Sequence, residues 1–278
     1  MVGLVGSWHQ MGRYTFAACA LALFATFLQG CAAGSGGGLG SEAKATEFTP
    51  SDEPETRRRA RIRLELAANY FGNGQPTVAL DEVKQALAAD PSYGDAFNLR
   101  GLIYMELGDL PQADDSFRKA LALRGADPNL LHNYGWLLCQ QRKFVEADQY
   151  FGRALADSTY ASRSKTLMAR GLCQSGAGNF LEAEQTLLKS YELDAGNPVV
   201  AYHLAALLFR RSEIARAQFY IRRLNNSQFA NAESLWLGIK VEQKLGDVVA
   251  MKQLGEQLRK RFPESREQAA FERGAFNE

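Results

Sequence analysis

A helical period in the hydrophobic positions begins near residue 57 and continues almost to the end of the chain. Apolar residues recur there three and four positions apart, which is the spacing of one face of an α-helix. Glycine, "LGD" and proline interrupt the pattern and divide it into short segments. No stretch alternates apolar and polar residues as a half-buried strand does. The pattern therefore predicts an all-α protein.

The helical segments repeat with a nearly constant period. A small residue recurs in the first helix of each repeat at steps of 34, 34, 36, 34 and 33 residues. The six positions are Ala67, Gly101, Gly135, Gly171, Ala205 and Gly238. An alanine follows the first five of them after twelve residues, and a bulky side chain follows that alanine after four more. We expect the small residues to let paired helices approach closely, and the bulky ones to fill the gap to the next pair.

This arrangement resembles the tetratricopeptide repeat (TPR). The resemblance implies a right-handed superhelical solenoid of six helix pairs over residues 56–264, followed by a capping helix or tail at 265–278. The sixth repeat departs from the pattern, because its "LGD" falls one residue late.

The first 30 residues predict a secretory signal sequence. The segment from Tyr14 to Leu28 carries no charge, and about fifteen apolar residues are too few for a bilayer span, which needs roughly twenty. The following "LQGC", residues 28–31, resembles the lipobox of bacterial lipoproteins except at Gln29. That resemblance implies lipidation of Cys31 and, because Ala32 follows instead of aspartate, sorting to the outer membrane. An ordinary signal peptide is the alternative, and Met11 is a second candidate start.

Composition adds a tether and a neutral charge. Residues 31–55 are rich in glycine and serine and predict a flexible tether. Removing residues 1–30 leaves 248 residues with 31 basic and 31 acidic side chains, so nothing favours nucleic acid as a partner. The basic run at 57–71 is either an exposed face paired with nearby acids or a contact for anionic lipid or an acidic partner. Carboxylates of the second helices, as in "VEADQ" (145–149) and "LEAEQ" (181–185), are expected to be solvated.

The remaining candidate chemistry does not indicate an enzyme. His132 and Cys139 share a helix face, but seven residues rise about 10.5 Å, which is too far for a thiolate–imidazole pair. No cluster has the spacing of metal ligands. We therefore expect no catalysis, no metal, no cofactor and no small-molecule substrate.

Two cysteines remain once the signal is removed and Cys31 is lipidated. Cys139 and Cys173 lie on neighbouring first helices, on flanks that face each other. We expect a disulfide between them in an oxidising compartment. Two buried, unpaired thiols are the alternative.

TPR arrays bind ligands in a concave groove that is lined by their first helices. With the small residue counted as position eight, the groove positions carry Leu64, Phe71, Asn98, Leu102, Met105, His132, Trp136, Met168, Leu172, Tyr202 and Phe209. These side chains are largely apolar and aromatic, with Asn98 and His132 as polar groups, which favours an extended or helical protein segment as ligand. Packing within the array is the alternative role for each of them.

A more specific resemblance covers the whole chain after the signal. Residues 96–123 and 130–155, and above all "NYGWLLCQQ" at 133–141, are similar to the second and third repeats of the type IV pilus biogenesis lipoproteins called pilotins. The resemblance implies a non-enzymatic factor that the lipoprotein transport machinery delivers to the inner leaflet of the outer membrane. There it would bind the secretin subunit of the pilus and promote secretin multimerisation. The alternative is a lipidated periplasmic adaptor for cell-wall hydrolases or another envelope-assembly machine.

Overall fold

The structure, a computed structural model, describes residues 53–276, and all regular secondary structure in that range is helical. Its thirteen helices are α1 (Glu55–Gly72), α2 (Pro76–Ala89), α3 (Gly94–Glu106), α4 (Leu110–Arg124), α5 (Pro128–Gln140), α6 (Phe144–Ala156), α7 (Arg163–Gly176), α8 (Phe180–Leu193), α9 (Pro198–Arg210), α10 (Ile214–Asn225), α11 (Ala232–Leu245), α12 (Val248–Arg261) and α13 (Arg266–Glu272). The predicted signal peptide, Cys31 and nearly all of the predicted tether lie outside the described residues.

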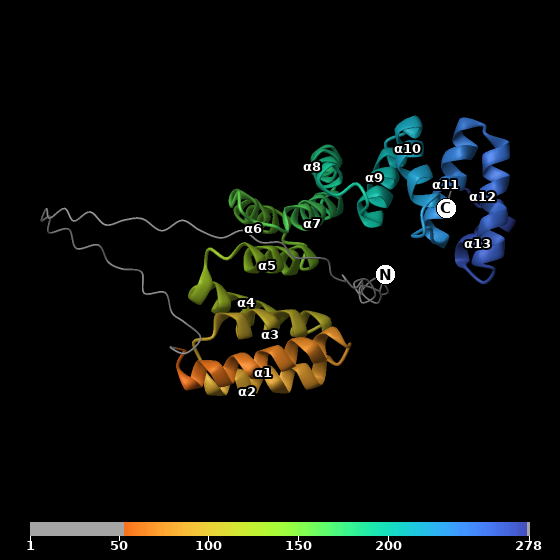
Figure 1. Ribbon diagram of the computed structural model, residues 1–278. Coiled ribbons are helices and arrows are strands. Elements are labelled where there is room, and N and C mark those ends of the chain that lie inside the picture. The colour runs from red at the N-terminus through yellow and green to blue at the C-terminus, as the bar shows by residue number, and fades with distance from the viewer. Residues whose placement is uncertain (1–52, 277–278) are drawn as a thin grey trace, which may run out of the picture. The chain divides into compact units, whose positions relative to one another are not determined.

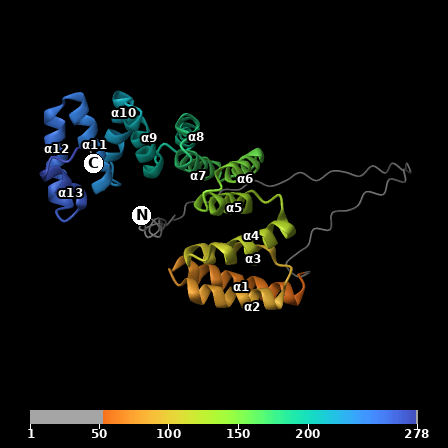
Figure 2. The ribbon, with the colours of Figure 1, turned by 180° about the vertical axis from the view of Figure 1, so that it is seen from behind.

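The helices pack as six consecutive pairs, from α1 with α2 to α11 with α12 (Figures 1 and 2). The prediction of an all-α TPR solenoid is confirmed. Two parts of the chain are compact in themselves. An N-terminal part contains α1 and α2 and ends at Asp90, and a C-terminal part contains α3 to α13 and begins at Pro91. Within residues 53–276, no helix combines the length and the apolar character that a bilayer crossing requires.

Local signals in the sequence start and stop these helices. Asp109, Asp127 and Asn197 each accept hydrogen bonds from backbone N–H groups at the start of the helix that follows. Asn231 and Ser234 form a reciprocal capping box at the start of α11. That helix ends at Leu245, and its C-cap Gly246 has a φ of 77°, a conformation that glycine adopts without strain. The turns predicted from "LGD" and proline are therefore built by specific caps.

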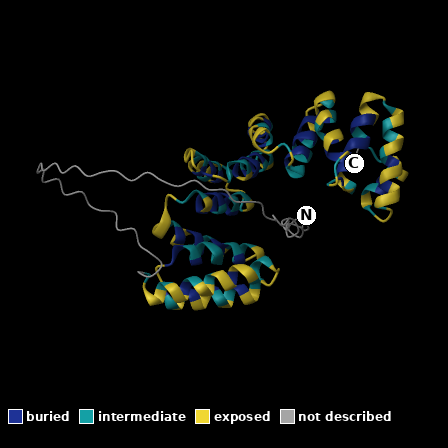
Figure 3. Ribbon diagram, viewed as in Figure 1, coloured by how far each residue is buried: buried dark blue, intermediate teal, exposed yellow. Residues whose placement is uncertain are grey.

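The glycine of a first helix is covered by the bulky residue of its own pair. A Cβ added to Gly101 would lie 2.7 Å from the Phe117 ring, and one added to Gly171 would lie 2.7 Å from Leu187. The bulky residues also reach the next pair as expected, since the Phe117 ring lies 6.0 Å from that of Tyr134 on α5. The close contact within a pair has a steric reason, because only a residue without a side chain lets the ring of the second helix rest on the first helix. Figure 3 shows the resulting buried seams between paired helices.

The short helix α13 repeats this packing at the C-terminal end. A Cβ at Gly255 of α12 would collide with the ring of Phe271 of α13, sixteen residues later, and the same spacing separates Gly101 from Phe117. The ring of Phe271 also lies 6.4 Å from that of Trp236 on α11. Thus α13 takes the place of a further helix and covers the apolar end of α11 and α12.

The arginine-rich helix α1 pairs its charges within the N-terminal part. Arg57 pairs with Asp90, Arg63 with Glu82, and Arg61 with two glutamates. From residue 53 to residue 90 there are six basic and six acidic side chains, so the net charge of this segment is zero. This pattern supports the reading of the run at 57–71 as a paired, exposed face, and it weakens the reading as a lipid contact.

Of the carboxylates in "VEADQ" and "LEAEQ", Glu146 and Glu182 are exposed as expected, Asp148 is half-buried, and Glu184 is buried in contrast to the expectation. Asp148 of α6 accepts two hydrogen bonds of 2.7 Å from Arg170 of α7, and this contact lowers the pKa of the Asp148 carboxyl. Glu184 of α8 is 6% exposed and pairs with Arg211 and Arg216. The arginines come from the next repeat, so these ion pairs link successive repeats.

Candidate functional site

The predicted groove residues of the C-terminal part lie on four successive first helices. Seven of them are half-buried, which leaves part of each side chain open to a ligand. These seven are Asn98, Leu102, Met105, Trp136, Leu172, Tyr202 and Phe209, and we call them the groove face. In the N-terminal part, Leu64 and Phe71 are half-buried on α1.

Two predicted groove residues are buried and do not belong to the groove face. His132 is 6% exposed and Met168 is 9% exposed. Met168 packs against Leu187 and Leu204 of the neighbouring helices. His132 lies against α7, where its Nδ1 is 2.9 Å from the Thr166 hydroxyl. Both were expected to face a ligand, and the neighbouring helices cover them instead.

A short hydrogen-bond chain fixes His132 between α5 and α7. The Thr166 hydroxyl that contacts Nδ1 is also 3.0 Å from the hydroxyl of Tyr160. Tyr160 belongs to the connection that lengthens the repeat step to 36 residues, and it is 6% exposed. Burial, with a smaller contribution from Lys165, lowers the pKa of His132 to about 4. His132 therefore has a neutral ring and a structural role at neutral pH.

This burial predicts a loss of stability in mild acid. The pKa of His132 is about 4 in the folded chain, against an ordinary value of 6.5. The unfolded state therefore binds more protons between these values, and stability falls as the pH drops from about 6.5 to about 4. The expected loss from this group is about 3 kcal/mol. Urea unfolding of the wild type and of His132→Gln at several pH values measures it.

The His132→Gln variant should show a flatter pH dependence than the wild type over this range. His203, whose pKa burial also lowers, should contribute a smaller residual slope in both proteins. Equal slopes in the two proteins would show that His132 does not carry the effect.

A disulfide joins two first helices beside the groove face. The structure pairs Cys139 of α5 with Cys173 of α7, with Cα atoms 5.7 Å apart and 34 residues between them in sequence. Cys173 is buried, and Cys139 packs next to Trp136 at the edge of one core cluster. The bond therefore fixes the joint between the third and fourth repeats, next to a ring of the groove face.

A cation that the sequence analysis missed lies beside the groove face, next to the Phe209 ring. Lys240 of α11 places its Nζ 5.9 Å from the ring centre of Phe209 and 5.5 Å from that of Trp236. Burial lowers the pKa of Lys240. Lys240 stands two positions after Gly238, the small residue of its helix, just as Cys173 stands two positions after Gly171. Its neighbour Phe209 stands four positions after Ala205, just as Cys139 stands four positions after Gly135. The sequence could have revealed the contact between Lys240 and Phe209, because the same register places position ten of each first helix next to position twelve of the preceding first helix.

Polar groups limit the groove face at both ends. Asn98 accepts a hydrogen bond of 3.1 Å from Asn133 of the next first helix. At the other end, burial raises the pKa of the Tyr202 phenol, and the negative charges of Glu233 and Glu267 add to this effect. The face thus presents apolar side chains and rings between polar ends, which suits an amphipathic protein segment better than an ion or a small metabolite.

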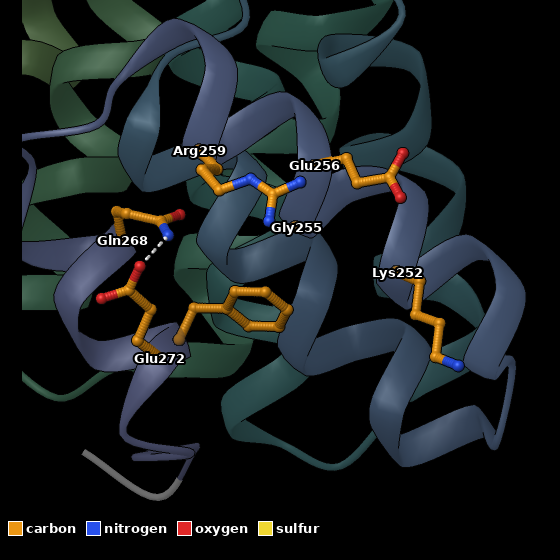
Figure 4. A pocket seen from close by; sticks show the side chains of 7 residues that line it. Lys252, Gly255, Glu256, Arg259, Gln268 and Glu272 are labelled. Carbon is orange, nitrogen blue, oxygen red and sulfur yellow. Dashed lines mark hydrogen bonds between the residues drawn. The ribbon is translucent and has the colours of Figure 1, made fainter.

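A small cavity of about 230 Å³ lies between α12 and α13. In Figure 4, Lys252, Glu256 and Arg259 extend from α12, and Gln268 donates a hydrogen bond to Glu272 on α13. Two basic and two acidic side chains line this cavity, so their charges cancel. Within residues 53–276, no three side chains gather as metal ligands would, and no group of this cavity indicates catalysis.

The helix pairs, the glycine seams and the row of half-buried apolar side chains define a TPR solenoid, a class of protein that binds other proteins. In agreement, a family model described as "Tetratricopeptide repeat" matches residues 64–129. The chain belongs to the family of type IV pilus biogenesis TPR proteins that includes PilF. The type IV pilus assembly protein PilF of Pseudomonas aeruginosa is 30% identical to it over 209 residues, which cover 75% of this chain and 83% of PilF.

Solved structures agree with this assignment. The crystal structure of PilW, a widely conserved type IV pilus biogenesis factor, superposes with a TM-score of 0.72 at 29% identity and covers 76% of this chain and 97% of PilW. A structure of Pseudomonas aeruginosa PilF gives a TM-score of 0.71 at 28% identity, with 80% of this chain and all of PilF covered. MamA of Desulfovibrio magneticus, at 18% identity and a TM-score of 0.53, shares the fold. The relatives named for the pilus support a role in pilus assembly through protein–protein contacts.

Proposed function

We propose that this protein is a pilotin, an outer-membrane lipoprotein that binds the secretin of the type IV pilus and promotes its localisation and multimerisation. The observation that carries the proposal is the groove face in a chain of the PilF family. Because the described side chains indicate no reaction, the protein acts by holding its partner.

In this proposal, the lipid on Cys31 supplies the location. The junction "LQGC" supports lipidation, and Ala32 supports transfer to the inner leaflet of the outer membrane, where the array faces the periplasm. The glycine-rich segment before the first helix gives the array reach from that leaflet. The secretin then meets its assembly factor at the membrane in which it must form a ring.

Cys31→Ser should leave a folded periplasmic protein that no longer fractionates with the outer membrane. Secretin multimers in the outer membrane should decline with it, because their assembly factor is no longer anchored. Palmitate labelling, membrane fractionation and secretin immunoblots measure these effects. The control is Ser41→Ala, a change in the same segment that should alter neither result. Palmitate incorporation that persists after Cys31→Ser would show that the anchor is at another residue.

Trp136→Ala should weaken secretin binding more than it weakens folding. The ring is half-buried, so its loss should lower the free energy of unfolding by about 1–3 kcal/mol, while removing an aromatic contact from the groove face. Pull-down of secretin from a secretin-expressing strain, together with urea unfolding, separates the two effects. The matched control is Phe219→Ala, because Phe219 is 59% exposed on the second helix α10.

Phe219→Ala should retain secretin binding. Equal loss of binding in both variants would show that the groove face is not the contact surface. A Trp136→Ala chain that fails to fold would show instead that the ring belongs to the core. Recovery of a cell-wall hydrolase in place of secretin would favour a periplasmic adaptor.

A further inference from the structure

The outer face of α1 is apolar at positions that the later repeats bury. Ile62 stands five residues before the small residue of its helix and is 54% exposed, and Leu66 stands one residue before it and is 36% exposed. In the second to fifth repeats, the residue five positions before the small one is at most 2% exposed. These residues are Ala96, Leu130, Thr166 and Val200. The first repeat therefore leaves open a surface that its counterparts cover.

In the later repeats, this face of a first helix receives the second helix of the preceding pair. Leu130 of α5 shares a core cluster with Phe117 of α4, and Val200 of α9 shares one with Leu187 of α8. Helices joined by a short connection run antiparallel, so the face is shaped for an antiparallel helix.

The two ends of the array differ in how they meet water. At the C-terminal end, α13 covers the apolar side chains of α11 and α12. Within residues 53–276, α1 is the first helix, and its outer face is not covered in this way. A terminal repeat that stays in water needs a polar outer face. The exposed Ile62 and Leu66 therefore indicate a contact surface for another helix.

Charged side chains stand on either side of Ile62 in a self-complementary order. Arg58 precedes Ile62 by four residues and Glu65 follows it by three, and both are exposed. They are seven residues apart, so they lie on the same side of the apolar stripe. When a second α1 lies antiparallel with its Ile62 opposite the first, Arg58 of each copy is level with Glu65 of the other, and one two-fold rotation forms both pairs.

The contacts that these two side chains make within one copy leave groups for a second copy. Arg58 pairs with Glu55, and Glu65 accepts a hydrogen bond of 2.9 Å from Arg61 through one carboxylate oxygen. Exposed pairs of this kind contribute little to stability. Arg58 retains further N–H donors, and Glu65 retains its second oxygen.

We propose that this protein pairs with a second copy of itself through antiparallel α1 helices. Ile62 and Leu66 of both copies form the centre of the contact, and an Arg58–Glu65 ion pair closes it on each side of Ile62. The helix has 18 residues and is about 27 Å long, and one helix face offers less area than a permanent dimer needs, so the pair is weak and reversible in solution.

The contact itself depends on neither lipidation nor secretin binding, but its use rests on the proposed function. Two copies anchored through Cys31 in one membrane are confined to the same surface, which raises their local concentration and favours the pair. A pair carries two groove faces and therefore holds two secretin subunits at once, at the start of multimerisation.

Sedimentation equilibrium of the chain that starts at residue 32 tests the pairing. We expect the mean mass to rise from one copy towards two as the protein concentration increases. Ile62→Ser removes the central apolar contact and should weaken the pair at least roughly tenfold. The matched control is Val78→Ser, because Val78 is an aliphatic residue of α2 that is 40% exposed. This control should leave the association unchanged, and circular dichroism checks that both variants fold.

Charge reversal distinguishes the antiparallel pair from any other contact of α1. Arg58→Glu and Glu65→Arg should each weaken self-association at least roughly tenfold, because each places like charges opposite one another. An equal mixture of the two variants should pair about as strongly as the wild type, since both ion pairs return with their charges exchanged between the copies. Contacts within one copy give no such recovery.

Three results would overturn the proposal. The first is the mass of a single copy at every concentration up to the solubility limit. The second is self-association that Ile62→Ser leaves unchanged, and the third is a mixture of the charge variants that associates no better than its components. Because the assay contains neither lipid nor secretin, these results are separate from those that test the proposed function.

Discussion

Phe151→Ala is expected to lower the free energy of unfolding by about 3–5 kcal/mol. The Phe151 ring is fully buried on α6 and rests on Gly135 of α5, where an added Cβ would lie 3.0 Å from it. Its ring centre is also 5.9 Å from that of His132. Alanine would leave a cavity in this seam, because the glycine opposite has no side chain to fill it. Urea unfolding followed by circular dichroism measures the loss.

The matched control for Phe151→Ala is Val145→Ala on the same helix. Val145 is 76% exposed, so its truncation should change stability by no more than about 0.5 kcal/mol. The urea slope should be compared as well, because repeat arrays lose cooperativity when one repeat is weakened. A loss below about 1 kcal/mol for Phe151→Ala would contradict the seam packing.

The repeat pattern predicted the fold because it is a local rule that recurs. A residue without a side chain must face a bulky one wherever two helices cross closely, so Gly101 and Gly171 mark the first helices without any knowledge of distant contacts. The same rule located Gly238 in the irregular sixth repeat. The bulky residue of a second helix packs against the glycine of its own pair and also against the next first helix, as Phe117 does with Gly101 and Tyr134.

The burial of individual groove positions depended on neighbours that the pattern does not describe. His132 is covered because Thr166 of α7 contacts its ring, and the Tyr160 hydroxyl from the longer connection contacts Thr166 in turn. Glu184 looks like a surface carboxylate in its own helix, and only the arrival of Arg211 and Arg216 from the next repeat makes it an interior ion pair. Both cases depend on contacts between repeats, which a single repeat cannot reveal.

Cys139→Ser is expected to lower the melting temperature, and the double variant Cys139→Ser/Cys173→Ser should cost no more than the single one. The bond closes a sequence separation of 34 residues, for which loop entropy gives about 3.8 kcal/mol. The measured loss should be smaller, because neighbouring repeats stay close in partly unfolded states. Each kcal/mol corresponds to roughly 2–4 °C for a chain of this size.

Reductant provides the matched control for the disulfide. It should lower the melting temperature of the wild type to that of the double variant and leave the double variant unchanged. Because the bond links α5 to α7 beside Trp136, its loss should also loosen the groove face and weaken secretin binding in the same pull-down. Two free thiols on an unfolded, unreduced chain that starts at residue 32 would rule out the bond. A double variant less stable than the single one would show that the two cysteines act separately, as packing groups.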